Sequence, residues 1–394
     1  MEQNSLSRAL TGLLFLAALF FLNFTSRVIF SPLLPFIEEE MGLAHAQSGS
    51  FFFFISAGYF VAILSSGFVS ARIGHKLTIV FSAIASGVVL FGLGFCTSLF
   101  TLRLTLFCLG LASGLYLPSG LVTISRIVAP AYLARGLAIH EIAPNLGFVA
   151  APLLCEILLS FVSWQEVLAW LGIVLIGIGM TYGLSSHGSG ERGKAPDLSA
   201  SGFLLRMGAF WAMCLFFSLG ICSTLGIYAM APLFLVTDHG MDPQEANRLL
   251  AFSRTASIFI PLLGGWLGDR FGNRRVMGTV LLITGILTIL MAMVGNGIWL
   301  MVFVVAQPLF AVCFFPSGFA VLSKLGPPEY GNLAVSLCIP FAFLLGGGVI
   351  PTLIGMIGDV ASISLGFILA GVALTLGGCF SFFLTFKGEN RGEM

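Results

Sequence analysis

The sequence predicts an all-α membrane protein with twelve transmembrane helices, arranged as two pseudo-symmetric bundles of six. Composition is the first observation: 58% of the 394 residues are hydrophobic and only 9% are charged, whereas soluble domains carry about 25% charged residues. The second is that apolar runs long enough to cross a hydrocarbon core of about 30 Å recur along the whole chain. The third is an internal repeat, which is typical of transporters whose site lies between related halves.

Twelve apolar runs are present, and a polar segment separates the sixth from the seventh. This segment, residues 186–202, predicts a flexible cytoplasmic linker. The predicted domains are therefore an N-terminal six-helix bundle (1–185), the linker (186–202) and a C-terminal six-helix bundle (203–394). The predicted spans lie near residues 9–36, 48–70, 77–97, 101–124, 136–160, 166–185, 203–236, 246–267, 276–296, 298–322, 332–356 and 362–386.

The repeat has an offset of 198 residues, which becomes 196 after a two-residue deletion, so that Leu137-Ala-Ile returns as Leu333-Ala-Val. Gly67-Phe-Val-Ser-Ala71-Arg72-Ile-Gly74-His75-Lys76 returns as Gly265-Trp-Leu-Gly-Asp269-Arg270-Phe-Gly272-Asn273-Arg274. Tyr116-Leu-Pro118-Ser119-Gly120 returns as Phe314-Phe-Pro316-Ser317-Gly318. An offset that holds over such a distance indicates a duplication, so the two halves are expected to share one fold.

The basic residues predict the orientation in the membrane. With the N-terminus inside, fourteen lysines and arginines fall in cytoplasmic segments, and only Arg103 and Arg248 fall in outer loops. This positive-inside bias predicts a multi-pass inner (plasma) membrane protein with both termini in the cytoplasm. Two arginines, Arg27 and Arg254, fall in neither kind of loop.

Several classes of function are excluded by what the sequence lacks. The eight cysteines are scattered through apolar spans without metal-ligand spacing, so we expect packing residues, no metal and no cofactor. Hydrolase, zinc-protease and nucleotide-binding motifs do not occur, so an enzyme and an ATP-driven pump are not expected. The net charge of +1 gives no indication of nucleic-acid binding.

The repeated loop segment resembles the Gly-x-x-x-Asp-Arg-x-Gly-Arg-Arg motif of the major facilitator superfamily. The second copy matches the motif well, through Gly265, Asp269, Arg270, Gly272, Arg274 and Arg275, whereas the first has Ala71 in place of the aspartate. Gly147-Phe-Val-Ala-Ala151-Pro152 loosely resembles a further element of that family. The resemblance implies the facilitator fold and alternating access, with a loop that latches the cytoplasmic helix ends. The residues implied in this gating motif are Gly67, Arg72, Gly74, Gly265, Asp269, Arg270, Gly272 and Arg274.

Arg27 and Arg254 are the first candidates for binding a substrate. Arg27 lies 19 residues after Arg8 and 11 before Glu38, and Arg254 lies 15 before Asp269, so both fall inside predicted spans. A guanidinium group in hydrocarbon costs at least about 3 kcal/mol, and its planar fork suits a carboxylate or phosphate. The alternatives are a structural pair with an acid from another helix, or a side chain that snorkels outwards.

The segment from Asn23 to Pro35 resembles the first helix of the anion:cation symporters, with Ser26 where an aspartate is usual. Monocarboxylate and oxalate facilitators likewise use buried cations from both halves. These resemblances imply an organic-anion substrate. The acids that would support proton coupling in those branches are missing here.

Three residues of the fifth span are candidates for carrying a proton: His140, Glu141 and Glu156. Glu141 adjoins a histidine, a residue that titrates near neutral pH. The two glutamates are 15 residues apart and cannot form a carboxylate pair. The alternative is that His140 and Glu141 form a loop-proximal pair bonded to Arg135 or Arg126.

Five further polar residues are candidates for lining the substrate cavity, although for each one singly helix packing or a helix–helix hydrogen bond is the favoured interpretation. They are Asn23, Tyr116, Ser119, Tyr228 and Ser317.

Together these features predict a secondary transporter of a small organic anion, by proton symport or by anion exchange. Its expected partners are the anion, protons and the lipid bilayer, and we expect a monomer. One alternative is a proton-driven exporter of hydrophobic or cationic drugs, against which the two buried arginines argue. Another is a membrane sensor that keeps a transporter fold.

Overall fold

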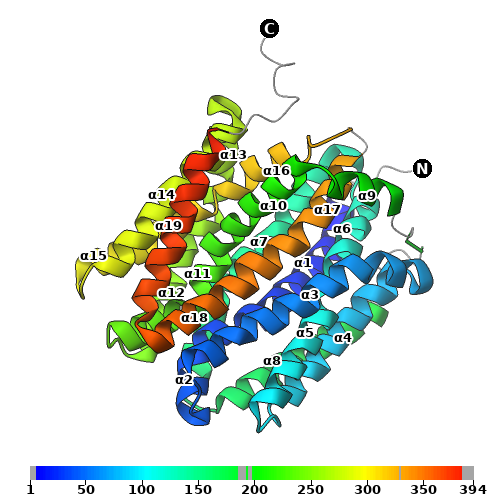
Figure 1. Ribbon diagram of the computed structural model, residues 1–394. Coiled ribbons are helices and arrows are strands. Elements are labelled where there is room, and N and C mark those ends of the chain that lie inside the picture. Colours follow the sequence, from blue (N-terminus) through cyan, green and yellow to red (C-terminus); the bar gives the residue numbers. More distant parts are fainter. Residues whose placement is uncertain (1–5, 185–191, 194–197, 328–329, 384–394) are drawn as a thin grey trace. The chain divides into compact units, whose positions relative to one another are not determined.

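The computed structural model describes residues 6–184, 192–193, 198–327 and 330–383, and every element within these ranges is a helix (Figure 1). By length and composition, eleven helices can cross a membrane, and a pair bent by 45°, Pro243–Ile258 with Ile260–Phe271, makes a twelfth. These correspond to the twelve predicted spans. The predicted all-α membrane fold is therefore confirmed, with the eighth span bent.

The chain divides into two compact units. The first comprises Met1–Ile37 with Phe54–Pro196, and the second comprises Glu38–Phe53 with Asp197–Met394. Most of the predicted linker 186–202 lies outside the described residues, but residues 198–202 belong to helix α9 (Leu198–Leu205). The sequence did not indicate that residues 38–53 pack with the second unit.

The first half of the chain supplies α1 to α8. Their bounds are α1 (Leu6–Val28), α2 (Phe30–Met41), α3 (His45–Ile73), α4 (His75–Leu93), α5 (Leu99–Gly114), α6 (Tyr116–Ile127), α7 (Leu133–Leu158) and α8 (Trp164–Leu184). The second half supplies, after α9, the helices α10 (Gly208–Ile221), α11 (Ile227–Leu233), α12 (Pro243–Thr255), α13 (Ile260–Phe271), α14 (Asn273–Met293), α15 (Ile298–Ala311), α16 (Phe314–Leu322), α17 (Gly331–Ala342), α18 (Ile350–Val360) and α19 (Ile363–Ser381).

Prolines interrupt several spans at defined points. A proline cannot donate a backbone hydrogen bond to the carbonyl four residues before it, and α1 ends at Val28, four residues before Pro32. The repeated prolines Pro118 and Pro316 interrupt the fourth and tenth spans in the same way, just after α5 and α15. The duplication has therefore preserved a helix break as well as a sequence motif.

Each unit contains a tight helix pair built on glycine at the same place in the repeat. In the first unit α4 packs along α8, and in the second α14 packs along α19 (Figure 1). A Cβ added to Gly87 would lie 2.5 Å from the carbonyl oxygen of Gly172, and one added to Gly285 would lie 2.6 Å from that of Gly371. Gly87 and Gly285 are related by the 198-residue offset, so this contact is common to both units.

The second unit contains π-helical turns that have no counterpart in the described part of the first. They are η2 (Cys222–Gly226), η3 (Phe234–Asp238) and η6 (Phe343–Val349). A Cβ on Gly226 would lie 2.5 Å from the carbonyl oxygen of Gly346, so η2 and η6 touch backbone to backbone. Because a π turn departs from the regular α-helical bonding pattern, it makes backbone carbonyls available to other donors.

Candidate functional site

Arg27 of the first unit is buried against an aromatic ring. Its side chain, one residue from the end of α1, is only 6% exposed. The guanidinium carbon lies 4.1 Å from the ring centroid of Tyr59 on α3 and 5.2 Å from that of Phe24. An aromatic face attracts a cation electrostatically, more strongly when water is excluded. Tyr59 therefore holds the positive charge in place.

Arg254 of the second unit is held by an aromatic ring and a backbone carbonyl. It lies on α12, is 3% exposed, and has its guanidinium carbon 5.0 Å from the ring centroid of Tyr228 on α11. Its Nη2 donates a hydrogen bond of 2.7 Å to the carbonyl of Thr224, within the π turn η2. The side chain thus points into the unit, unlike the snorkelling alternative.

A second carbonyl of the same π turn is bonded by Gln307 on α15. Its Nε2 donates to the carbonyl of Ser223 at 2.8 Å. Gln307, Arg254 and Tyr228 line a cavity of about 20 Å³, which has room for about one water molecule. The arginine is therefore enclosed by polar groups of its own unit.

The first unit uses Asn23 in a comparable way. Its Nδ2 donates to the carbonyl of Ser113 at 3.1 Å, which joins α1 to α5. The side chain is 2% exposed. The predicted cavity residue Asn23 therefore has a helix-pairing contact in this structure.

Ser119 and Ser317, the two cavity candidates that the repeat relates to each other, lie beside the loop motif. The Oγ of Ser119 is 3.3 Å from Nδ1 of His75, the first residue of α4. In the second unit, a Cβ added to Gly268 would lie 2.7 Å from the Oγ of Ser317 and would also contact Asn273. His75 and Asn273 are related by the repeat, so each serine lies near an equivalent position of the motif.

A tight turn lies within the motif in both copies. Gly74 has a φ of 82° and Gly272 a φ of 89°, values that favour glycine because a side chain would be strained there. Each glycine separates two helices, α3 from α4 and α13 from α14.

The charged motif residues lie near these turns. Asp269 and Arg270 are exposed, and the Arg270 guanidinium carbon lies 5.4 Å from the ring centroid of Trp266. Arg274 donates from Nη2 to the carbonyl of Phe382 at 2.9 Å. Within the described ranges no ion pair of Asp269 is found. The remaining motif positions are Gly67 and Gly265, which are half-buried, and Arg72, which is exposed.

The proton-carrying candidates separate into two places on α7. His140 is fully buried, and its Nε2 lies 3.1 Å from the hydroxyl of Tyr116. Its Nδ1 lies 3.6 Å from Oε1 of Glu141, whose side chain is 57% exposed. Glu156 lies four turns further along the helix. The structure therefore gives His140 a partner on α6, Tyr116.

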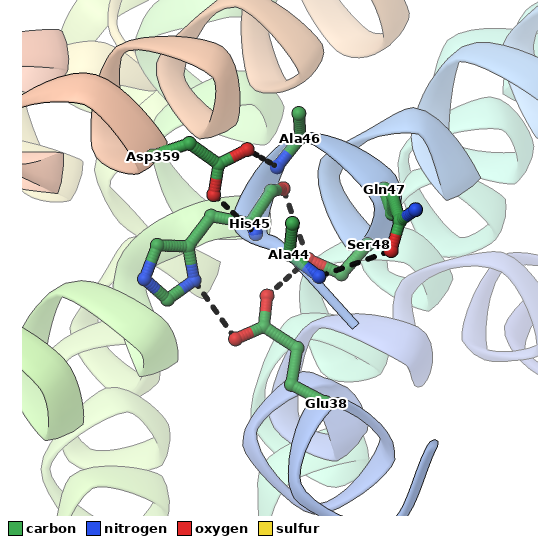
Figure 2. A network of polar contacts seen from close by, with 7 residues as sticks. All are labelled: Glu38, Ala44, His45, Ala46, Gln47, Ser48 and Asp359. Carbon is green, nitrogen blue, oxygen red and sulfur yellow. Dashed lines mark hydrogen bonds and ion pairs between the residues drawn. The ribbon is translucent and has the colours of Figure 1, made fainter. Parts of the chain in front are cut away.

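Figure 2 shows a polar network that the sequence did not indicate, within the second unit. Glu38 accepts from Ser48 and pairs with Nδ1 of His45 at 2.8 Å. Asp359 of α18 accepts hydrogen bonds from the backbone N–H groups of His45 (2.7 Å) and Ala46 (3.0 Å). A carboxylate from a distant part of the sequence thus caps the first turn of α3.

Sequence reasoning also missed Tyr59, Gln307 and the carbonyl of Thr224. A buried tyrosine in an apolar span is one available signal, because its hydroxyl must find a partner. The carbonyl has no sequence signal, because its availability depends on the π turn. Only six tyrosines occur in the chain, so each tyrosine inside a predicted span, Tyr59 among them, could have been considered as a partner for a buried charge.

Comparison with known proteins agrees with this architecture. The sequence matches the Major Facilitator Superfamily over residues 16–253 and 226–393. A solved structure of a bacterial homologue of the human lysosomal transporter Spinster, inward-facing and occupied, superposes with a TM-score of 0.80 at 16% identity, covering 96% of this chain and 97% of that one. The two chains share a fold.

Two curated relatives are more similar in sequence. The probable sulfoacetate transporter SauU of Cupriavidus necator is 26% identical, over 68% of this chain and 67% of that protein. The membrane sensor protein UhpC of Salmonella typhimurium is 24% identical, over 73% of this chain and 68% of that protein.

Proposed function

Because the chain belongs to the Major Facilitator Superfamily, and so is a multi-pass transmembrane transporter, we propose that it moves a small organic anion of the carboxylate type by alternating access. The observation that supports this proposal is the pair of buried arginines, Arg27 and Arg254, one from each repeat.

Aromatic rings orient both arginines, and a backbone carbonyl also orients Arg254. Arg27 lies over Tyr59, and Arg254 lies over Tyr228 and donates to a backbone carbonyl. Such groups orient a guanidinium without cancelling its charge. A carboxylate of the substrate offsets the cost of burying that charge, through short charge-assisted hydrogen bonds.

Similarity supports the same substrate class. SauU is named as a probable sulfoacetate transporter, and sulfoacetate is a small organic anion. The substrate of this chain is a molecule of that kind, with a planar carboxylate for the arginine fork. Asn23, four residues before Arg27 in the sequence, and Tyr228, whose ring lies beside the Arg254 guanidinium, complete the candidate set.

The proposal includes a topology. The protein alternates between inward-open and outward-open states, the linker 186–202 and both termini lie in the cytoplasm, and the protein works as a monomer in the inner membrane. The loop around Asp269 and Arg270 latches the inward end. Labelling of single cysteines placed at residues 192 and 103 tests the orientation, because only one of the two should react from outside.

Uptake into proteoliposomes tests the function. Labelled sulfoacetate, monocarboxylates and dicarboxylates are offered to the wild type, Arg27→Gln and Arg254→Gln. Each variant is expected to reduce uptake about 100-fold, since removing one partner of a buried charge pair costs several kcal/mol. Anion uptake that survives in both variants would refute the proposal.

Arg103→Gln is the matched control. Arg103 is also an arginine over an aromatic ring, with its guanidinium carbon 5.6 Å from the ring centroid of Phe54. It is half-buried rather than buried, so its variant is expected to transport at the wild-type rate.

A sensor is the second candidate function, because UhpC is named as a membrane sensor protein. A sensor binds its ligand without moving it. Thermal stabilisation by an anion in the complete absence of uptake would favour the sensor.

A further inference from the structure

The hydrogen bonds around Tyr116 determine which nitrogen of His140 carries a proton. The Tyr116 hydroxyl lies 2.6 Å from the carbonyl oxygen of Leu16 on α1. A carbonyl can only accept, so the single hydroxyl proton of the tyrosine is donated to it. Nε2 of His140, 3.1 Å from the same hydroxyl, must then be the donor to the tyrosine oxygen.

In this tautomer Nδ1 of neutral His140 carries no proton, so it can only accept a hydrogen bond. The atom is buried, makes no hydrogen bond among the described residues, and lies 3.6 Å from Oε1 of Glu141. With Glu141 ionised, two acceptors face each other across this gap. One added proton resolves the conflict, because whichever atom holds it can donate to the other.

We infer that His140 and Glu141 together bind the coupling proton, so that the transporter is a proton symporter. The inference rests on the proposed function and decides between its two modes, symport and exchange. The ring of His140 is fixed by stacking on Phe20, with centroids 4.4 Å apart and planes 6° apart. The nitrogen that receives the proton is therefore held in one orientation.

His140 and Glu141 differ in exposure, and this difference gives them different roles in proton uptake. His140 is fully buried, whereas the Glu141 side chain is 57% exposed. Protons reach the exposed carboxylate first and pass over the short gap to Nδ1. Histidine suits this role because either of its ring nitrogens can hold a proton and donate it.

The charged and titratable groups near the site come from several helices. Tyr116 of α6 contacts the histidine directly, and Tyr182 of α8 lies against Phe15 of α1, with ring centroids 5.8 Å apart. Arg27 is on α1, seven residues beyond Phe20. Protonation of the pair removes one negative charge from a region that also holds this arginine.

Coupling follows from that change in charge. A carboxylate binds more favourably beside Arg27 when Glu141 no longer repels it, and by linkage the bound anion favours protonation to the same extent. The chain of bonds from Leu16 through Tyr116 to His140 also joins α1 to α6 and α7. The anion and the proton therefore act on the same helix.

Two transport assays on reconstituted full-length protein test the inference. Counterflow of labelled sulfoacetate at equal pH requires binding and alternating access, but no net movement of protons. Accumulation driven by an acid exterior, followed with a pH dye trapped inside, requires the coupling proton. The wild type is expected to show both, with acidification of the interior on uptake.

In His140→Gln and Glu141→Gln, counterflow is expected to remain measurable. The pH-driven accumulation of anion is expected to fall at least about tenfold. Glu141 is exposed, so its variant should fold even if the buried one does not. His239→Gln is the control, because His239 bonds Asn296 in the second unit and should leave coupling intact. NMR of ¹⁵N-labelled histidine should show His140 as the Nε2–H tautomer. Tyr116→Phe should change the signals of that histidine, because it removes the acceptor of the Nε2 proton.

The outcomes separate the inference from the function on which it rests. Counterflow in the wild type without acidification would mean exchange and would overturn the inference alone, as would full coupling in both variants. Wild-type protein that moves none of the offered anions would reject the proposed function and the coupling with it.

Discussion

The two units carry the same pair of interacting residues on exchanged helices. In the first, the arginine is on the first span (Arg27) and the tyrosine on the second (Tyr59). In the second unit the tyrosine is on the first span of the repeat (Tyr228) and the arginine on its second (Arg254). The 198-residue offset places Arg27 opposite Leu225, so neither residue was inherited from the other.

The buried side-chain amides, Asn23 and Gln307, also lie on different helices of the two repeats. Asn23 on the first span donates to a carbonyl at the fourth, whereas Gln307 on the tenth span donates to a carbonyl of the seventh. A duplicated backbone brings the same helices together in each unit, so either member of a pair can supply the donor. Packing constrains the geometry of the pair more strongly than it constrains which helix bears the charge.

The units differ most in how the arginine is held. Arg254 bonds a carbonyl in a π turn, whereas Arg27 lies beside the rings of Tyr59 and Phe24. The first unit also holds the His140–Glu141 pair, and the repeat places Leu337 opposite Glu141. If both proposals hold, this asymmetry divides the roles: protons are handled in the first unit, and the more rigid anion contact lies in the second.

Replacing each arginine by lysine should give the largest difference between the units. Lysine keeps the charge but loses the planar fork. Arg254→Lys loses its bond to Thr224 as well as the bidentate anion contact, so we expect uptake to fall about 100-fold. Arg27→Lys keeps an ammonium over Tyr59 and should lose only about tenfold. Equal losses in initial-rate assays would contradict the comparison.

Alanine at the shared glycine contact should affect both units alike. Gly87→Ala and Gly285→Ala each force a methyl group against a facing backbone carbonyl, and overpacking of this kind costs about 1–3 kcal/mol. Thermal unfolding in detergent should show similar losses for the two variants. Gly177→Ala, where a Cβ meets nothing within 4 Å, is the control and should unfold like the wild type. A large loss in only one unit would show that the scaffold is not equivalent.

Removing the aromatic ring under each arginine should have a smaller effect. Tyr59→Leu and Tyr228→Leu delete a cation–π contact worth about 0.5–2 kcal/mol, so anion affinity should fall about 3- to 30-fold. Because Tyr59 is the closer ring, at 4.1 Å against 5.0 Å, its variant should be the weaker binder. Calorimetric titration with the transported anion measures this order, and Tyr228→Phe, which keeps the ring, should bind nearly normally.

The smallest effect is expected at the caps. Asp359→Asn weakens a charged cap that α18 supplies to α3, and a cap contributes about 1 kcal/mol. Asp242→Asn is the matched variant, because Asp242 caps its own helix α12 through Gln244 at 2.9 Å and Glu245 at 3.3 Å. The remote cap should lower the unfolding temperature more, since it also joins distant segments. The reverse order would show that the network of Figure 2 contributes little.

The sequence predicts most of the fold because a bilayer imposes simple requirements. Twenty apolar residues in a row form a helix, since every backbone group must be satisfied within the segment. The repeated glycines of the loop motif and the repeated prolines likewise behave as their backbone chemistry dictates. Arg27 and Arg254 could be selected for a related reason: a charge inside a span is costly and needs a use.

The partners of those charges were decided only by the tertiary structure. Tyr59, Gln307 and the carbonyl of Thr224 are far from their partners in sequence, and nothing local marks the π turn that makes the carbonyl available. Ser119 and Ser317 were selected, like the other cavity candidates, as polar residues within apolar spans, but they lie beside the loop motif. Hydrophobic patterning fixes which segments cross the membrane, because burial is a property of each segment. Contacts between polar side chains depend on how the helices pack, which is a property of the whole bundle.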